Sequence, residues 1–340
     1  PGASIAVIHN GEISWAKGFG IADTITQREV TTSTLFTANS ITKTLTSLAV
    51  VKLLADKEIA LDEPVNRYLT SWKIPKNQFT AKVPVTFRML LNHTAALTSP
   101  YPDGCCGPKE ILPTVKQFLN GKPPATNPPV TVNNVPGEKY AYCNGCYSVL
   151  QPAIEDVGDK PFKRLMNELV IQPAKMMNST FDDEFFLEDS STIAIPYDSD
   201  GSLHKKAPMR STILSPGLLW TTATDLALFN LAFTRALRGE GTLINQRLAE
   251  ALIIPSSTPT LSIGFFIVNK NAQEDSKGDY LSHSGSNIGY LSLSIISKDG
   301  KKGAVILINK GPNPFTTTEI PEYSFITDSL KLISKYNRWD

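Results

Sequence analysis

A serine three residues ahead of a lysine is the pattern in this chain that could support covalent catalysis. A serine hydroxyl becomes a good nucleophile only when a neighbouring base removes its proton. A lysine amine can be that base, but a free lysine, with a pKa of about 10.4, is protonated at neutral pH. The pattern occurs at Ser14 and Lys17, at Ser40 and Lys43, and at Ser202 and Lys205. Local structure must therefore decide which copy is usable.

Only the copy at Ser40 lies in a segment that predicts cooperating side chains. Ser14 follows an Asn10-Gly11 turn and falls on the second strand of a hairpin, where residues three apart point to opposite faces. The third copy lies in a polar stretch without periodicity, which predicts a loop. From Ser40 onward, apolar residues recur about every 3.6 positions, which predicts a helix over 40–56 with one buried face.

The start of this helix suits acyl transfer. Ser40 and Lys43 would share one face, with Cβ atoms roughly 5–6 Å apart. Burial and the positive end of the helix dipole would lower the pKa of Lys43 towards the ~7–8 that a working base needs. The Ser40 N–H could also stabilise an oxyanion. The alternative interpretation is that Asn39 or Ser40 only caps the helix and that Lys43 is solvated.

Composition and motifs argue against several other classes of protein. The 340-residue chain has a formal net charge of +1 and 19% charged residues, so no basic field indicates nucleic acid or an acidic membrane surface. No run of 18 apolar residues indicates a membrane span. No spaced ligand set such as His-Glu-x-x-His indicates a metal, and we expect no cofactor. The chain opens inside a strand pattern and shows no signal peptide, which could have been removed.

The four cysteines form an adjacent pair and a Cys-x-x-Cys pair: Cys105, Cys106, Cys143 and Cys146. The adjacent pair is poorly placed for tetrahedral zinc coordination. We favour a disulfide that ties the 98–113 loop to the 142–147 segment, although three connectivities are open. Such a bridge would place the protein in an oxidising compartment, so we expect a secreted or periplasmic location.

Strands are predicted at the two ends of the chain and helices in its middle. The strands fall at 2–8 and 12–20, which form a hairpin, and within 261–270, 289–297 and 303–309. The helices fall at 40–56, 85–92, 109–119, 143–158, 161–170, 224–237 and 323–336. This order predicts an α+β fold, with an antiparallel five-stranded sheet flanked by helices plus a mostly helical lobe.

These elements are expected to form one catalytic unit over 1–340. Its α/β lobe would comprise about 1–60 and 240–340, and its helical lobe about 61–239. The proline-rich segment 121–137 cannot be regular structure and is predicted to be an ordered loop near a site.

Tyr142 and Asn144 flank Cys143 just before the helix predicted at 143–158. A tyrosine could pass a proton between nucleophile and leaving group, and an asparagine amide could orient both lysine and substrate. The alternative is that Tyr142 is a packed aromatic residue and Asn144 a helix cap.

A second polar stretch, His283-Ser284-Gly285-Ser286, is predicted to begin a turn between two strands. Gly285 would let the backbone approach a ligand closely, and the Ser286 N–H could complete an oxyanion hole. The alternative is an ordinary polar hairpin.

Ser-x-x-Lys, then Tyr-x-Asn, then His-x-Gly resembles the order of motifs in the penicillin-recognising serine hydrolases. The tyrosine version is similar to the branch with class C β-lactamases, D-alanyl-D-alanine carboxypeptidases, D-aminopeptidases and β-lactamase-like esterases. The resemblance covers nearly the whole chain, since the opening hairpin is followed in the same order by LDEPVNRYL, VTFRMLLNHTAAL, PGEKYAYCNGCYSVL, SPGLLWTTATDLALF and HSGSNIGY. It implies the β-lactamase/transpeptidase-like fold.

The resemblance also implies roles for residues of this chain. The catalytic residues would be Ser40 as nucleophile, Lys43 as its base and Tyr142 as proton shuttle. The substrate would lie against Asn144, His283, Ser284 and Gly285. The oxyanion hole would be formed by the N–H groups of Ser40 and Ser286.

Three departures from the family pattern stand out. Ala95 and Ala96 replace a common Ser-Gly, which would alter that turn, and Cys146 replaces a glycine. His283 replaces the lysine that offers a fixed positive charge to carboxylate-bearing substrates such as penicillins. A histidine, with a reference pKa near 6.5, would be mostly neutral at pH 7. The sequence therefore favours a peptidase acting on D-amino-acid peptides, or an esterase, working through an acyl-enzyme on a small substrate.

Two alternatives remain open: a class C-type β-lactamase, and a non-catalytic homologue that binds cell-wall fragments or a protein partner. A Ser-His-Asp hydrolase is disfavoured because no Gly-x-Ser-x-Gly elbow is present and the four histidines lie in unlike contexts.

Overall fold

The computed structural model describes residues 1–100, 111–204, 208, 210–256, 260–268, 280–311, 322–337 and 339. The strands in this part are β1 (Gly2–His9), β2 (Glu12–Asp23), β3 (Arg28–Glu29), β4 (Phe36–Thr37), β5 (Trp220–Thr221), β6 (Phe266–Val268), β7 (Tyr280–Asn287), β8 (Tyr290–Ser297) and β9 (Lys302–Ile308). The α-helices are α1 (Thr42–Asp56), α2 (Phe87–Leu91), α3 (Val115–Asn120), α4 (Asn144–Gly158), α5 (Phe162–Met166), α6 (Phe185–Glu188), α7 (Ala223–Leu237), α8 (Gln246–Leu252) and α9 (Glu322–Tyr336).

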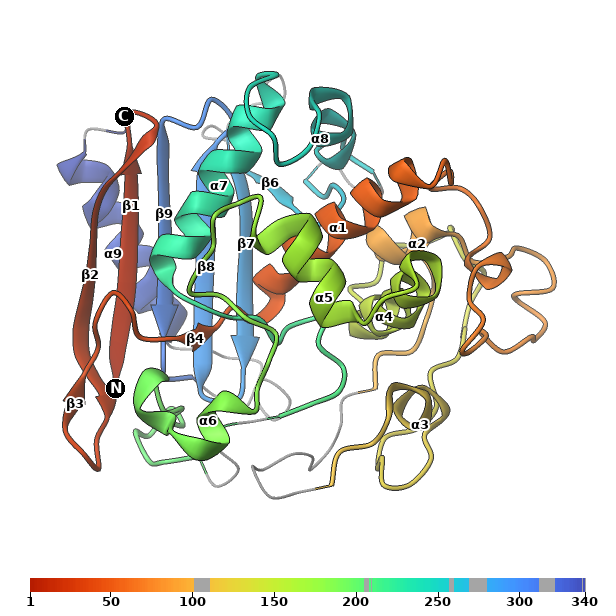
Figure 1. Ribbon diagram of the computed structural model, residues 1–340, viewed down its shortest axis with the longest axis horizontal. Coiled ribbons are helices and arrows are strands. Elements are labelled where there is room, and N and C mark those ends of the chain that lie inside the picture. The colour runs from red at the N-terminus through yellow and green to blue at the C-terminus, as the bar shows by residue number, and fades with distance from the viewer. Residues whose placement is uncertain are drawn as a thin grey trace.

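The main sheet joins strands from both ends of the chain, as predicted (Figure 1). Its order is β3-β2-β1-β9-β8-β7-β6, and every neighbouring pair is antiparallel. The five long strands are β2, β1, β9, β8 and β7, while β3 and β6 are short additions at the two edges. The α+β prediction is therefore confirmed, with two short edge strands beyond the five expected. A separate pair, β4 and β5, brings the segment before α1 next to residues 220–221.

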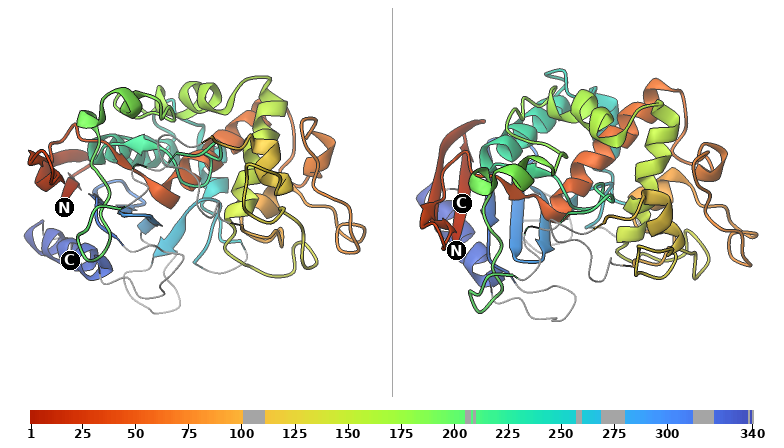
Figure 2. Two further views of the ribbon diagram at one scale, coloured as in Figure 1. Left: turned by 90° about the horizontal axis from the view of Figure 1, so that it is seen from below. Right: turned by 60° about the horizontal axis from the view of Figure 1, so that its bottom comes forward.

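Both faces of the sheet are covered by helices (Figures 1 and 2). Alternate β1 residues point to opposite faces. Ala3, Ile5 and Val7 pack with Ile326 and Ile333 of α9 in one core cluster. The other face packs against α7 and belongs to the larger core, which continues through α1 into the helices of the middle of the chain. The division into two lobes stays a prediction, and α7, which was expected in the helical lobe, lies on the sheet.

Helix α1 is buried nearly all round, so the expectation of a single buried face is wrong. It lies between the sheet and the other helices, and its hydroxyl residues can be buried because each has a partner. The Thr42 hydroxyl accepts a hydrogen bond from Leu219 N. The remaining three hydroxyls bond to distant segments: Thr44 donates to Gly264 O, Thr46 donates to Ser215 O, and Ser47 pairs with the Tyr147 hydroxyl.

The stretch His283–Ser286 lies inside strand β7, so the prediction that it begins a turn is wrong. The turn consists of Ile288 and Gly289, and β7 pairs with β8 along its whole length. Serine, glycine and asparagine favour turns when read alone. Here the pairing with β8 and the packing against the start of α1 override that local preference.

Most predicted helices occur within a few residues of their expected bounds. The helices expected at 109–119 and 161–170 begin at Val115 and Phe162, and the second passes into a π-helical turn over Asn167–Ile171. The short helices α6 and α8 were not predicted. Segment 121–137 is irregular, as expected, and its Val132 forms an isolated bridge with Leu97.

Ala96 has a left-handed backbone conformation, with φ of 52°. This is the position at which the resemblance leads one to expect glycine. A side chain with a Cβ is disfavoured in this region by roughly 1–2 kcal/mol, whereas glycine is not. The carbonyl of Ala96 also accepts a hydrogen bond from Asn133 N, so the turn anchors segment 121–137.

We predict that Ala96→Gly raises the free energy of unfolding by about 1 kcal/mol, because the relieved strain exceeds the added entropy of the unfolded chain. Urea unfolding of the two proteins is the measurement. Ala95→Gly is the control, since Ala95 is not among the residues with positive φ and is fully buried, and it should destabilise. An Ala96→Gly protein no more stable than the parent would contradict this account of the turn.

Candidate active site

Ser40 lies in a 3-10 turn, Asn39–Ile41, that leads directly into α1. Asn39 has a left-handed conformation, with φ of 52°, and is fixed from both sides. Its amide oxygen accepts a hydrogen bond from the Thr37 hydroxyl, and its amide nitrogen donates to Ser292 Oγ on β8. These contacts tie the turn that carries Ser40 to the sheet.

Lys43 is buried, with 1% of its surface exposed, one helical turn after Ser40. Its Nζ lies 3.2 Å from Ser40 Oγ and donates a second hydrogen bond, of 2.7 Å, to Pro216 O. Burial lowers the pKa of Lys43 to about 7, because desolvation disfavours the ammonium form. The alternative of a solvated Lys43 is therefore wrong, and a large share of neutral amine is expected at neutral pH.

Tyr142 lies immediately before α4, and its ring covers the Lys43 amine. The distance from Lys43 Nζ to the ring centroid is 5.0 Å. Tyr142 is 40% exposed, so it is not the packed core aromatic of the alternative reading. Asn144 is the first residue of α4 and not its cap, because Cys143 holds the N-cap position and accepts a hydrogen bond from Cys146 N.

Strand β7 runs against the Ser40 turn at Gly285. A Cβ atom built on Gly285 would lie 2.5 Å from Asn39 Cβ and 2.6 Å from Ser40 N, so a larger residue would push the strand away from the Ser40 turn. The close approach predicted for Gly285 is thus directed at the protein's own backbone.

The edge of β7 beside Ser40 remains open over residues 283–287 within the part of the chain that the structure describes. Pairing with β6 stops at Ser282. Hydrogen-bonded and non-bonded pairs alternate along an antiparallel ladder, and Asn287 and Tyr290 close a two-residue turn. The N–H of Ser286 therefore points away from β8 towards the open edge, where it could join Ser40 N–H as an oxyanion donor.

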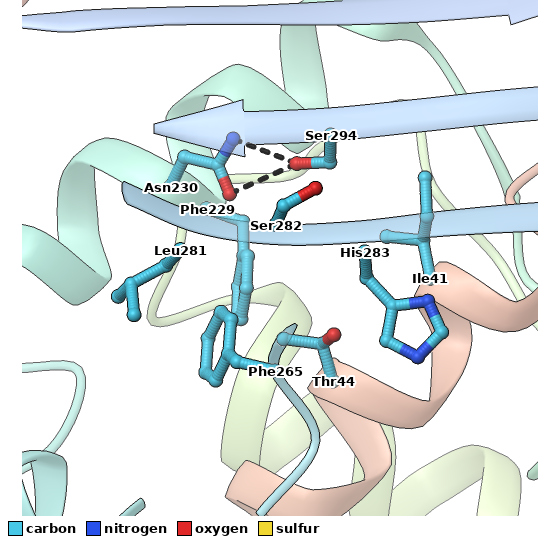
Figure 3. A pocket seen from close by; sticks show the side chains of 9 residues that line it. All are labelled: Ile41, Thr44, Phe229, Asn230, Phe265, Leu281, Ser282, His283 and Ser294. Atoms are coloured by element: carbon cyan, nitrogen blue, oxygen red, sulfur yellow. Dashed lines mark hydrogen bonds between the residues drawn. The ribbon is translucent and has the colours of Figure 1, made fainter. Parts of the chain in front are cut away.

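His283 is almost fully buried, and Figure 3 shows its ring pointing from β7 towards α1, beside Ile41 and Thr44. Its Nδ1 lies 2.6 Å from Ser284 O, and its ring meets Phe266 edge-on. Burial, followed by the charge of Lys43, lowers the pKa of His283 to about 3. The residue is therefore neutral at pH 7. The Ser284 and Ser286 side chains project from the opposite face of the strand.

Two hollows lie near and far from this cluster. A cavity of about 10 Å³, lined by His283, Thr44, Ser282 and others, adjoins the site and has room for about one water molecule (Figure 3). A larger pocket, of about 360 Å³, lies between Asn66 and Val85 and contains none of the predicted site residues.

His93 is a member of the cluster that sequence reasoning missed. Its ring lies 4.6 Å from the Tyr142 ring, centroid to centroid, and its Nδ1 accepts a hydrogen bond from Cys143 N. Burial, then the charges of Lys43 and His283, lower its pKa to about 3. The stretch VTFRMLLNHTAAL was noticed only as part of a resemblance, and a single histidine after a helix gave no separate signal.

Cys143 and Cys146 form a disulfide with each other, with Cα atoms 5.3 Å apart. The favoured link from the 142–147 segment to the 98–113 loop is therefore wrong. The first turn of α4 brings two cysteines three positions apart within bonding reach, which makes a longer bridge unnecessary. Cys105 and Cys106 lie outside the described residues.

The arrangement provides a hydroxyl, a neutral amine, a phenol and backbone donors around one point, which is a set suited to acyl transfer. Among the described residues, no cluster of three metal-ligating side chains occurs. None of the helices in the same residues has the length and apolar character of a membrane span.

Comparisons with known proteins agree with this geometry. The protein PbpX of Bacillus subtilis (strain 168) is 24% identical over 304 residues, which cover 89% of this chain and 69% of that protein. The octameric penicillin-binding protein homologue from Pyrococcus abyssi is 25% identical with a TM-score of 0.72, over 91% of this chain and 69% of that one.

The D-amino acid amidase from Ochrobactrum anthropi SV3 superposes with a TM-score of 0.77 over 99% of this chain and 94% of its own. At 19% identity this likeness shows the fold alone. The sequence profile of the Beta-lactamase family matches residues 1–326. Since that match spans nearly the whole chain and the fold agrees, the chain belongs to the Beta-lactamase family.

Proposed function

We propose that the chain is a serine hydrolase that works through an acyl-enzyme, as a peptidase for D-amino-acid peptides or as an esterase. The observation that carries the proposal is the buried Lys43 amine, 3.2 Å from Ser40 Oγ and with a pKa lowered to about 7. A neutral amine at that distance can accept the proton of the serine hydroxyl.

The proposed reaction runs in two halves. Ser40 Oγ attacks the substrate carbonyl while its proton passes to Lys43 Nζ, and the N–H groups of Ser40 and Ser286 stabilise the oxyanion. The Tyr142 hydroxyl relays that proton to the leaving amine or alkoxide, which departs and leaves an ester on Ser40. Water then attacks this ester with the same groups as base and acid, so that Ser40 regains its proton and the carboxylic acid is released.

Neutral or amine-bearing acyl donors are favoured over carboxylate-bearing ones. His283 stands where the family commonly places a lysine, and its lowered pKa keeps it uncharged at pH 7. A carboxylate buried against it would lack a fixed cationic partner. The likeness to a D-amino acid amidase and to a penicillin-binding protein homologue supports an amide or peptide substrate without naming it.

A class C-type β-lactamase is the second candidate, favoured by membership of the Beta-lactamase family. Turnover of nitrocefin comparable with that of p-nitrophenyl esters would support it. A third candidate is a non-catalytic homologue that binds cell-wall fragments or a partner, and an intact Ser40 that resists fluorophosphonate would support that one. We also propose an extracytoplasmic location, supported by the Cys143–Cys146 disulfide.

We predict that Ser40→Ala lowers p-nitrophenyl ester hydrolysis by at least about a thousandfold, because the nucleophile is lost. The measurement is steady-state turnover, with thermal unfolding to show that the fold is retained. Ser14→Ala is the matched control, since that serine belongs to a Ser-x-x-Lys copy on a strand, and it should keep full activity. Undiminished hydrolysis by Ser40→Ala would remove Ser40 from its role.

Fluorophosphonate labelling of Ser40 should accelerate as the pH rises through about 7, the pKa to which Lys43 is lowered. Below that pH Lys43 is an ammonium ion and cannot take the serine proton, whereas above it the amine is free. The rate of label incorporation, followed by intact mass from pH 5 to 9, is the measurement. Lys43→Met should lose the fast reaction, while Lys57→Met, at the exposed end of α1, should keep the profile. A flat profile would contradict the role of Lys43.

His283→Lys should raise kcat/KM for a carboxylate-bearing β-lactam relative to a neutral ester by about tenfold, which corresponds to one charge contact of about 1.4 kcal/mol. His283→Gln, which adds no charge, is the control and should leave the ratio unchanged. The measurement is the ratio of the two kcat/KM values for each protein. An unchanged ratio in His283→Lys would mean that position 283 does not read substrate charge.

A further inference from the structure

We propose that His93 is a positioning residue that fixes Tyr142 over the Lys43 amine, an inference that rests on the proposed function. His93 follows α2 and is far from Tyr142 in sequence. It is buried, with 3% of its surface exposed, whereas Tyr142 is 40% exposed. A half-exposed ring that precedes a helix needs an external support if it is to stay in one place.

The backbone on both sides of Tyr142 is bound to His93. The His93 carbonyl accepts a hydrogen bond of 2.9 Å from Ala141 N, and its Nδ1 accepts one of 3.0 Å from Cys143 N. The residues immediately before and after Tyr142 are thus held by one and the same residue. Because the Cys143 N–H is buried, losing its acceptor would leave an unsatisfied donor.

The ring of His93 adds a third contact. It packs at 4.6 Å and 31° on the Tyr142 ring, and it also meets the rings of Tyr140 at 6.0 Å and Tyr147 at 5.3 Å. On its other side the Tyr142 ring lies 5.0 Å from Lys43 Nζ. The phenol that would relay the proton is therefore held between the imidazole and the amine.

The hydrogen bond to Cys143 requires an unprotonated Nδ1, and so a neutral ring that carries its proton on Nε2. Burial and the neighbouring Lys43 keep His93 in that form, since its pKa is lowered to about 3. The acceptor is therefore present over the whole range in which the enzyme would work. His93 does not reach the reacting atoms in this arrangement, so its effect on the reaction passes through Tyr142.

Two amide substitutions separate this role from general packing. In His93→Asn the side-chain oxygen occupies the place of Nδ1, and asparagine tolerates the left-handed backbone of this position, where φ is 61°. In His93→Gln the oxygen falls nearer the place of Nε2, so the Cys143 N–H loses its acceptor. Both variants lose the ring and differ mainly in the acceptor.

We expect His93→Asn to keep kcat for ester hydrolysis within about fivefold of the parent and His93→Gln to lower it by about 10- to 100-fold, because a displacement of about 1 Å costs that much. KM should change by less than about threefold in either. Equal losses in the two variants would overturn the inference. Should His93→Gln not fold, as judged by thermal unfolding, His93→Phe takes its place, since it also lacks an acceptor.

A double-mutant cycle with Tyr142→Phe provides the decisive readout. If His93 acts through the phenol, His93→Gln should cost less than about twofold once that hydroxyl is gone. Losses that multiply in a chain where Tyr142→Phe is itself impaired would overturn the inference and leave the proposed function standing. A parent chain without turnover, or a fully active Tyr142→Phe, would overturn the proposed function and this inference with it.

Discussion

The burial of one lysine amine is the constraint on which the rest of the site depends. A charged ammonium is costly to remove from water unless it is paired with an anion. Among the described residues, the hydrogen-bond partners of Lys43 Nζ are a hydroxyl and a carbonyl, and no carboxylate forms an ion pair with it. The fold therefore stabilises the neutral amine, which is the form that can act as a base. To do so, the sheet, residues 215–219 and α4 must enclose α1 from several sides.

The same dry environment determines the charge of the neighbouring histidines. His93 and His283 both have pKa values lowered by burial and by the nearby amine, so neither supplies a positive charge at neutral pH. The site thus combines a nucleophile, a neutral base and backbone donors with little fixed charge. This combination is suited to neutral acyl donors, and it separates the chain from relatives in which a lysine occupies the position of His283.

The sequence allowed the parts with strong local signals to be predicted. The 3.6-residue spacing after Ser40 located α1, and alternation located the strands at both ends. Interactions between distant segments were harder. His283–Ser286 looked like a turn because its residues favour turns, yet pairing with β8 makes it a strand. The burial of α1 on all sides was missed because its threonines look solvent-facing until their partners on Gly264, Ser215 and Leu219 are known.

Two features of the site could not be predicted for a similar reason. The contacts of His93 with Ala141 and Cys143 join residues about fifty positions apart, and no periodicity records such contacts. The disulfide was assigned to the wrong pair because four cysteines allow three pairings, and only the helical turn at the start of α4 shows that Cys143 and Cys146 meet.

The titration of Lys43 itself tests the central claim most directly. Lysine labelled with ¹³C at Cε would be observed by NMR between pH 5 and 11, with the Lys43 signal assigned by its absence in Lys43→Met. A midpoint near 7 is expected, because burial lowers the pKa of this amine to about 7. A midpoint near the ordinary value of about 10.4 would show that the amine is charged at neutral pH and cannot activate Ser40.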